Sequence, residues 1–476
     1  MIAQLLNRQF VLEQLADVRR QLEKDVEQNR SGGSAGVEHL ESSDYEKALG
    51  LVAEAEISET QQSSGQPGFE SSDVGRSRAH SGAPLDDFSF LSRDPVINIV
   101  QSALEEYFEE RGMAPAEQVE RVELPDDRRG LASEVAVTDC ALRDVFPSRI
   151  EAGRRIFNKF SITDAGWVSC KVAEGIRLFT GKHSFNEDRP APLHIADQAR
   201  VLLVGDWGTG LPRAREVSGK MRRFIEEGKA SNLEVHVIHL GDVYYAGWER
   251  EYRKRFLPHW PVKPAEADSI GSWCLNANHD MYSGGYGYFD FLLADGRFGR
   301  QQRSSYFELF NQHWQIIGLD SGWDAGDLKD PQSQWVETCV ASSERKVMLL
   351  SHHPLFSVYD PKCVGKEMGK KLRKTLQSKR VRGWFWGHEH RCMLYDDYLD
   401  VPFARCVGNG GVPVYMTHNV DDPYPAPGNY EYRGWIDKGL EPWALMGFAV
   451  LDFDGPAINI RYVNEYGNTH KAEVIE

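Results

Sequence analysis

From residue 199 onward the sequence predicts an α/β fold, in which buried strands alternate with helices. Short apolar runs bounded by glycine, such as VLLVGD and VIHLGD, are typical of strands buried on both faces. Towards the end of the chain apolar and polar residues alternate, as in antiparallel strands with one solvated face. We therefore expect either one sheet that is parallel at one end and antiparallel at the other, or two stacked sheets flanked by helices.

The alternation can be followed element by element. The predicted strands cover residues 200–205, 233–240, 305–309, 313–319, 346–351 and 381–386. The predicted helices cover residues 213–229, 249–257, 332–342 and 365–378. The antiparallel strands lie in FARCVGNGG, MGFAVLDFDG and AINIRYVNEYG.

Upstream of this domain the sequence predicts two simpler segments. Residues 1–29 predict an amphipathic helix with leucines near heptad spacing. This helix either self-associates through residues 1–28 as a short coiled coil, packs on its own chain, or is a partly frayed arm. Residues 30–93 are rich in Ser and Gly and predict a flexible linker, with one short helix around YEKALGLVAEAEI.

Residues 94–195 predict a small, mainly helical accessory domain. Asp94 and Pro95 supply an N-cap followed by an N1 proline. Further helices are expected at 148–160 and 166–180, and no catalytic pattern falls in this range. Residues 196–476 are then the main domain.

Composition narrows the function. The chain has 476 residues, 41% hydrophobic, with a formal net charge of −16. This acidic balance argues against a nucleic-acid partner, because proteins that bind nucleic acid normally carry a basic face. The 7 cysteines form no CxxC pair, which indicates reduced thiols. No segment is typical of a signal peptide or a membrane span, so we expect a cytoplasmic protein without a membrane partner.

Five segments end in potential metal ligands. They supply Asp206, Asp242, Asn278, His352, and the pair His388 and His390. Binding residues of an α/β sheet collect beyond the carboxyl ends of its strands, so we expect these side chains to converge. Asp, Asn and His donors suit Fe, Mn, Zn or Ni in an open site. A carboxylate such as that of Asp242 can bridge two cations, as in two-metal hydrolases.

The order GD, GDxxY, NHD, H-x-P and GHxH resembles the calcineurin-like metallophosphoesterases over about residues 199–463. Two details are similar to the purple acid phosphatases within that superfamily. The first block is DWG, without the histidine of a DxH motif, and Tyr245 follows Asp242 by three residues. The resemblance implies two stacked mixed β-sheets flanked by helices, the sandwich of this superfamily.

The resemblance also implies a centre of two metal ions, iron together with Fe, Mn or Zn. The first ion would bind Asp206, Asp242, Tyr245 and His390, and the second Asp242, Asn278, His352 and His388. His279 would bind substrate phosphate together with Asn278 and protonate the leaving oxygen. Asp280 would orient that imidazole, and His353 would support the ligands without binding metal. From the residue alone, Tyr245 is equally a buried core tyrosine.

The expected activity is hydrolysis of a small phosphate ester by a metal-bound hydroxide, most simply by a phosphatase. One alternative is a phosphodiesterase acting on cyclic nucleotides or other small diesters. An alternative of another class is an interaction scaffold without turnover, against which His279 argues because a scaffold needs no catalytic histidine. Specificity is expected in loops 248–272, 281–303, 356–364 and 412–440, where Trp248, Trp323, Tyr359 and Tyr415 either line the pocket or pack at its rim.

Overall fold

The computed structural model describes residues 181–359, 364–414, 416, 418–436 and 443–476, with short pieces and single positions before residue 181. The chain divides into two units, Met1–Thr180 and Gly181–Glu476. The sequence predicted that the main domain begins at residue 196, slightly later than the second unit does.

In the first unit the described residues include two antiparallel strand pairs. β1 (Ala3–Leu5) pairs with β2 (Glu120–Val122), and β3 (Ser148–Glu151) pairs with β4 (Arg154–Phe157). The helix predicted over 148–160 is therefore wrong. Glu151 pairs with Arg154 across these two strands.

Helical positions in the first unit fall inside the other predicted helices. They are Ala16, Arg19, Arg20, Glu23, Ala53, Cys170, Ala173, Glu174 and Arg177. A helix was predicted over residues 1–29, and β1 occupies a short part of that range. The self-association through residues 1–28 stays a prediction. Most of the linker over 30–93 lies outside the described residues.

The second unit contains two mixed β-sheets, which confirms the predicted fold class. The six-stranded sheet has the order β18-β17-β16-β6-β7-β8. Its strands are β6 (Ala199–Val204), β7 (Glu234–His239), β8 (Ile270–Cys274), β16 (Gly447–Asp454), β17 (Ala457–Asn464) and β18 (Thr469–Ile475). The β6, β7 and β8 strands are parallel, whereas β16, β17 and β18 are antiparallel to their neighbours.

The eight-stranded sheet has the order β15-β13-β14-β12-β11-β10-β9-β5. Its strands are β5 (Leu193–His194), β9 (Phe307–Phe310), β10 (Trp314–Gly318), β11 (Lys346–Ser351), β12 (Val381–Trp386), β13 (Cys392–Tyr395), β14 (Phe403–Val407) and β15 (Gly428–Glu431). The central strands β10, β11, β12 and β14 are parallel. Both sheets therefore contribute parallel strands whose carboxyl ends can carry ligands.

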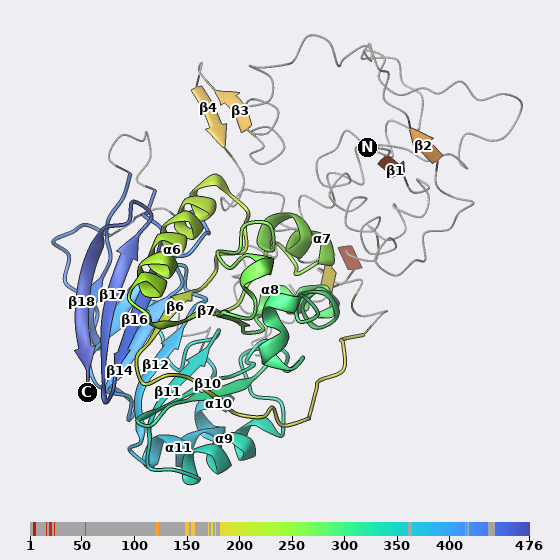
Figure 1. The fold of residues 1–476 in the computed structure, drawn as a ribbon. Coiled ribbons are helices and arrows are strands. Elements are labelled where there is room, and N and C mark those ends of the chain that lie inside the picture. Colours follow the sequence, from red (N-terminus) through yellow and green to blue (C-terminus); the bar gives the residue numbers. More distant parts are fainter. Residues whose placement is uncertain are drawn as a thin grey trace, which may run out of the picture. The chain divides into compact units, whose positions relative to one another are not determined.

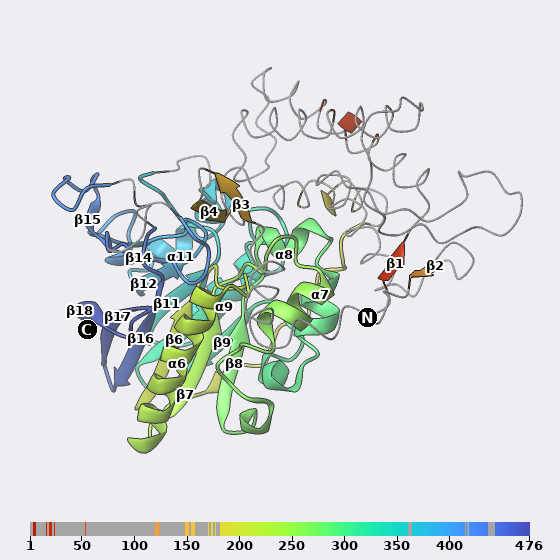
Figure 2. The same ribbon diagram turned by 90° about the horizontal axis from the view of Figure 1, so that it is seen from above.

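Helices flank the two sheets (Figures 1 and 2). α6 (Pro212–Ala230) starts with proline at its first turn and buries Val217, Met221 and Phe224 on the outer side of the six-stranded sheet. The outer side of the eight-stranded sheet packs against α9 (Gln332–Ala341), α10 (Lys366–Lys371) and α11 (Arg373–Gln377). The remaining helices are α7 (Glu249–Glu251), η3 (Tyr252–Phe256), η4 (Pro264–Glu266), α8 (Asn278–Tyr282), η5 (Gly287–Leu292) and η6 (Gly296–Gln301).

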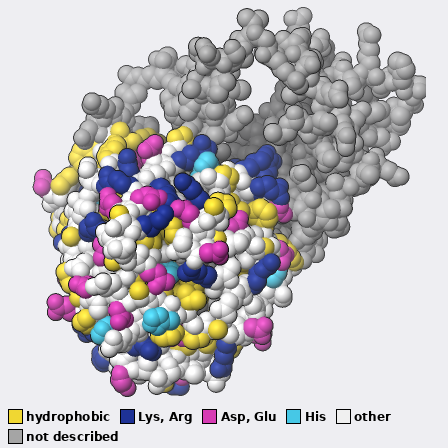
Figure 3. Space-filling view, in the orientation of Figure 1, with side chains coloured by type: hydrophobic (Ala, Val, Ile, Leu, Met, Phe, Trp, Pro, Cys, Tyr) yellow, Lys and Arg dark blue, Asp and Glu magenta, His cyan; other side chains and the backbone are white. Residues whose placement is uncertain are grey.

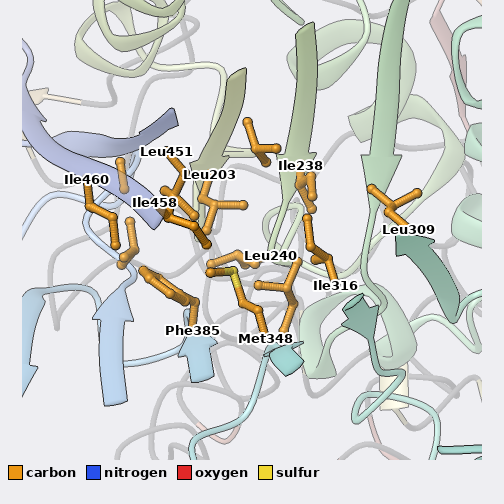
Figure 4. Close-up of a cluster of buried hydrophobic side chains, with 14 of the residues drawn as sticks. Leu203, Ile238, Leu240, Leu309, Ile316, Met348, Phe385, Leu451, Ile458 and Ile460 are labelled. Carbon is orange, nitrogen blue, oxygen red and sulfur yellow. The ribbon is translucent and has the colours of Figure 1, made fainter. Parts of the chain in front are cut away.

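The main core lies between the sheets. Figure 4 shows Leu203, Ile238 and Leu451 of the six-stranded sheet gathered with Met348 and Phe385 of the eight-stranded one. Burial of these branched and aromatic side chains fixes one sheet against the other, with each side chain contributing about 1.5–3 kcal/mol. This packing also holds the ends of the strands in fixed positions.

The surface gives one further observation. On the face seen in Figure 3, acidic and basic side chains are intermixed over the described residues. In the part of the chain that the structure describes, no helix is both long and apolar enough to span a membrane.

Candidate metal centre

The predicted ligands lie just beyond the ends of parallel strands of both sheets. Asp206 follows β6, Asp242 follows β7, and Asn278 opens α8 after β8. His352 comes directly after β11 and His388 two residues after β12. The φ angles of Asp206, Asp242, His388 and His390 are +57°, +78°, +74° and +49°. Left-handed backbone is unfavourable for residues with a Cβ and concentrates at functional sites.

Glycines let the main chain approach these ligands closely. A Cβ added at Gly387 would lie 2.7 Å from Oδ2 of Asp206, and one at Gly408 would lie 2.8 Å from the same atom. Gly408 begins the GNGG segment that follows β14. A side chain at either position would displace a candidate ligand, so both positions require glycine.

The hydroxyl of Tyr244 stands at the centre of the first ligand group. It lies 3.0 Å from Oδ1 of Asp206, 2.8 Å from Oδ2 of Asp242 and 2.9 Å from Nε2 of His390. The sequence placed Tyr245 here instead. Tyr245 accepts a hydrogen bond from His279 through its carbonyl oxygen, and its ring faces the guanidinium of Arg255 at 5.6 Å.

The position of Tyr244 follows from the local backbone. Val243 forms a parallel bridge with Gly208, and the Tyr244 amide donates to the carbonyl of Gly208 at 3.1 Å. Residues 244–246 form a turn after this bridge, and the turn directs the Tyr244 hydroxyl back to Oδ2 of Asp242 at 2.8 Å. The spacing of Asp and Tyr in GDxxY does not indicate in which direction a tyrosine side chain points.

The second ligand group surrounds His352. Its Nδ1 donates to the carbonyl of Leu240 at 3.0 Å, because a carbonyl oxygen can only accept. Nε2 is therefore the nitrogen that a metal ion could bind, and it lies 3.5 Å from Oδ2 of Asp242 and 2.9 Å from Nδ1 of His388. A histidine whose second nitrogen is held by a carbonyl is the usual arrangement for a metal ligand.

Asn278 gives the sharpest test of whether metal fits. Its Nδ2 donates to the hydroxyl of Tyr282 at 3.1 Å. Its Oδ1 is buried and has no hydrogen-bond partner among the described residues. An unpartnered buried carbonyl oxygen costs about 1–3 kcal/mol, and coordination to a cation would remove that cost.

Three histidines approach one another beside this group. His352, His353 and His388 offer nitrogens that all lie within 4.8 Å, as do atoms of Asp206, Asp242 and His352. Nδ1 of His353 is 2.9 Å from the hydroxyl of Ser321, which positions the ring behind the other two. The supporting role predicted for His353 stays a prediction.

His279 lies beside the carboxylates, but it is oriented differently from the prediction. Its Nδ1 donates to the carbonyl of Tyr245 at 2.6 Å, and its Nε2 is 4.0 Å from Oδ2 of Asp242. The Asp280 carboxylate instead accepts from the Asp242 amide at 3.1 Å and from the hydroxyl of Tyr252. The main chain of Tyr245 therefore orients His279, while Asp280 positions the Asp242 turn.

Burial makes this cluster of charges unfavourable by itself. Burial, and next the Asp242 carboxylate, raise the pKa of Asp206 well above its ordinary value. Burial likewise raises the pKa of Tyr244, and Asp206 and Asp242 add to the effect. Burial lowers the pKa of His390 to about 3, helped by His279 and Arg391. Cations would reverse this balance, since they favour ionised carboxylates and neutral imidazoles.

Sequence reasoning missed Glu251. Its buried carboxylate accepts from the amides of Tyr245, Ala246 and Trp248, and it fixes the turn that carries Tyr244. A motif search passes over this residue because its partners are main-chain amides and the Arg255 guanidinium, at 3.0 Å, and it is not itself a candidate metal ligand. A glutamate one turn into a helix that follows a ligand segment is a weak signal by which it could have been found.

One family model matches the part of the chain that carries this arrangement. The model of the calcineurin-like phosphoesterase family matches residues 199–392. The chain contains a calcineurin-like phosphoesterase domain. The matched range runs from β6 to the first residue of β13 and contains all the candidate ligands of the phosphoesterase domain. A search of curated proteins finds no match.

Solved structures with weak similarity include GAP50, described as the anchor in the inner membrane complex of Plasmodium. It has 12% identity, a TM-score of 0.41, and coverage of 59% of this chain and 89% of that one. A dimetal phosphatase from Danio rerio has 15% identity, a TM-score of 0.37, and coverage of 58% and 98%. A cold-active protein-tyrosine phosphatase from Shewanella has 12% identity, a TM-score of 0.27, and coverage of 61% and 83%. The functional conclusion comes from the family match and the site instead.

Proposed function

We propose that the phosphoesterase domain hydrolyses a small phosphate ester at a centre of two metal ions, most simply as a phosphatase. The observation that carries this proposal is the convergence of Asp206, Asp242 and His352 from three strand ends, with donor atoms within 4.8 Å of one another. The buried Oδ1 of Asn278 supports it, because this atom has no partner among the described residues. The family match supports the reaction class.

The residues divide into two ligand sets. Asp206, Asp242, Tyr244 and His390 would hold the first ion, and Asp242, Asn278, His352 and His388 would hold the second. Two such ions supply Lewis acidity and a nucleophilic water when bound. A phenolate is a hard anionic donor, so Tyr244 favours ferric iron in the first set, with Fe, Mn or Zn in the second. In this respect the proposal follows the purple acid phosphatases, with Tyr244 in place of Tyr245.

His279 handles the proton of the leaving group. Because its Nδ1 donates to the carbonyl of Tyr245, the exchangeable proton belongs to Nε2. Water adds to phosphorus, the ester P–O bond breaks, and the departing oxygen takes the proton from Nε2. Asn278 and His279 stand together at the start of α8.

Hydrolysis of 4-nitrophenyl phosphate and of bis(4-nitrophenyl) phosphate tests the proposal. Purified protein is supplied with Fe, Mn or Zn in turn, and Asp242→Asn serves as the control because it removes the bridging carboxylate. We expect metal-dependent turnover that is lost in the variant, with the monoester favoured over the diester. Turnover of wild-type magnitude by Asp242→Asn contradicts the two-metal centre, and a preference for the diester would indicate a phosphodiesterase.

A further inference from the structure

A pocket opens directly beside the candidate metal centre. It has a volume of about 50 Å³ and is lined by His390, Arg391, Asn409, His418, Glu431 and Tyr432, among others. His390 belongs to both the pocket and the ligand set, so a phosphate held at the centre would have the rest of its molecule next to this space. The pocket includes part of loop 412–440, in which the sequence predicted specificity.

A buried carboxylate organises the pocket wall. Glu431 accepts from Nη1 of Arg391 at 3.1 Å, Nε of Arg433 at 2.9 Å and the hydroxyl of Tyr359 at 2.9 Å. Its oxygens also lie 2.9 Å and 3.0 Å from Nδ1 of His418. Glu431 thus connects Arg391, which lines the pocket, with the buried Arg433.

Arg391 is held in place and still has capacity to bind. Its guanidinium lies 4.2 Å above the ring of Tyr359, and its Nε donates to the carbonyl of Glu389 at 3.3 Å. Nη2 makes no hydrogen bond to any residue that the structure describes, and the side chain is 30% exposed. A guanidinium that is oriented in advance binds a carboxylate or phosphate with little loss of entropy.

The carboxylate of the other acidic residue of the pocket makes its hydrogen bonds to residues other than Arg391. Glu389 accepts from the hydroxyl of Ser357 and from Nε1 of Trp386 at 3.0 Å. The remaining wall includes Val414, Met416 and Leu445, which suit a short carbon skeleton. The pocket thus combines an apolar wall with one cation that can receive an anion.

We propose that this pocket binds a second anionic group of the substrate, so that the substrates are phosphate esters whose leaving part carries a carboxylate or a second phosphate. Arg391 is the residue that recognises this group, and Glu431 positions Arg391. The inference rests on the proposed function, because the first phosphate occupies the metal centre. It adds a substrate class that the metal ligands alone do not specify.

Calorimetric titration with non-hydrolysable phosphonates tests the proposal on the full-length, metal-loaded protein. The probes are propylphosphonate, 3-phosphonopropanoate and propane-1,3-bisphosphonate, which differ only in the group distant from the phosphonate. The second anionic group should tighten Kd about tenfold, as a charge-assisted hydrogen bond does. The carboxylate and bisphosphonate probes distinguish the two kinds of anion.

The matched variants are Arg391→Gln, Arg391→Lys and Arg373→Gln. Arg391→Gln should abolish the tenfold gain, while Glu431 keeps Arg433, His418 and Tyr359 as partners. Arg391→Lys should retain part of the gain, and Arg373→Gln, on the exposed side of α11, should retain all of it. Equal Kd values for the three probes, or a gain that survives in Arg391→Gln, would overturn the subsite.

Turnover of 4-nitrophenyl phosphate, measured in parallel, separates this inference from the proposed function. Binding gains that depend on Arg391, without any turnover, would support the anion pocket and contradict the hydrolase. Turnover together with equal binding of all three probes would support the hydrolase and contradict the pocket. If no probe binds at all, the pocket is overturned as well.

Discussion

At the scale of single residues, the tyrosine pair after Asp242 decides which side chain completes the first ligand set. Tyr244 places its hydroxyl within 3.0 Å of both carboxylates, whereas Tyr245 contacts His279 through its carbonyl oxygen and Arg255 through its ring. A phenolate bound to ferric iron absorbs visible light by charge transfer. Substitutions of the two adjacent tyrosines should therefore have opposite effects on this absorption.

Tyr244→Phe should abolish the visible absorption of the iron-loaded protein and lower its iron content, while Tyr245→Phe should leave both close to wild type. The reason is that only the first change removes an oxygen from the ligand set. Absorption spectra and metal analysis of the two variants check this. Colour lost in Tyr245→Phe but kept in Tyr244→Phe would restore the assignment made from the motif.

The same pair shows what the sequence could not provide. Asp206, Asp242, Asn278, His352, His388 and His390 could be predicted because each ends an apolar run. A ligand within a turn is different, because its direction depends on the hydrogen bonds of the turn. Here the bridge between Val243 and Gly208 and the hydrogen bond from the Tyr245 amide to Glu251 set the direction of the tyrosine side chains. Gly208 and Glu251 both lie outside the GDxxY motif.

At the scale of elements, strand β12 shows how closely the main chain must pass the ligands. Gly387 directly follows the strand, and a Cβ there would meet Oδ2 of Asp206, which is already held by the His388 amide at 2.7 Å. Gly383 lies within the same strand, and a Cβ there would find its nearest atom at 3.5 Å, an ordinary contact. A side chain is therefore tolerated at one position within the strand and excluded at the position just after it.

Gly387→Ala should weaken metal binding by about tenfold or more, since ligand displacement costs at least as much as loss of a supporting contact. Gly383→Ala should bind metal as the wild type does and serves as the matched control. Titration of the metal-free proteins with Mn or Zn measures the difference. Similar affinities for both variants would mean that the Asp206 carboxylate can move without loss.

Strand β15 ends in a second buried network, at Glu431. Burial alone would raise the pKa of this carboxyl, but the Arg433 hydrogen bond, with Arg391, Tyr359 and His418, holds it below its ordinary value of 4.5. A group whose pKa is lowered on folding stabilises the fold above its unfolded pKa. That stabilisation is lost as pH falls below 4.5 and through the lowered folded value.

Glu431→Gln should reduce the free energy of unfolding at pH 7 by about 3 kcal/mol, because Arg433 would remain buried without its carboxylate. The difference from wild type should shrink as the pH is lowered towards 3. Denaturant unfolding at several pH values measures it. Glu344→Gln is the control, since Glu344 is 99% exposed in its pair with Arg380 and should change stability by less than about 0.5 kcal/mol.

Prediction from sequence also succeeded unevenly among the elements. Strands such as β6 and β11 are short, continuous apolar runs, so their ends were predicted to within a residue or two. The β3–β4 hairpin was mistaken for a helix because Ile150, Ile156 and Phe157 fit a helical stripe almost as well as a strand. In a segment this short, helical and strand periods cannot be separated by the positions of three apolar residues.

At the scale of the whole molecule, the metal centre connects the two sheets. Asp206, Asp242 and Asn278 follow strands of the six-stranded sheet, while His352 and His388 follow strands of the eight-stranded sheet. Ions bound by both sets would therefore add a link between layers otherwise held by apolar packing. Without them, buried carboxylates face one another, as the raised pKa of Asp206 indicates.

Removal of metal should consequently lower the melting temperature of the second unit. At free metal 100 times above Kd, binding contributes about 2.7 kcal/mol, which corresponds to roughly 5 °C or more for a unit of this size. Fluorescence of the buried tryptophans, among them Trp207, Trp273 and Trp384, reports this unit. Asp242→Asn should melt at the same temperature with and without chelator, because it lacks the bridge. If the chelator leaves the melting temperature of the wild-type protein unchanged, the sheets hold together without the ions, and the centre would then serve chemistry alone.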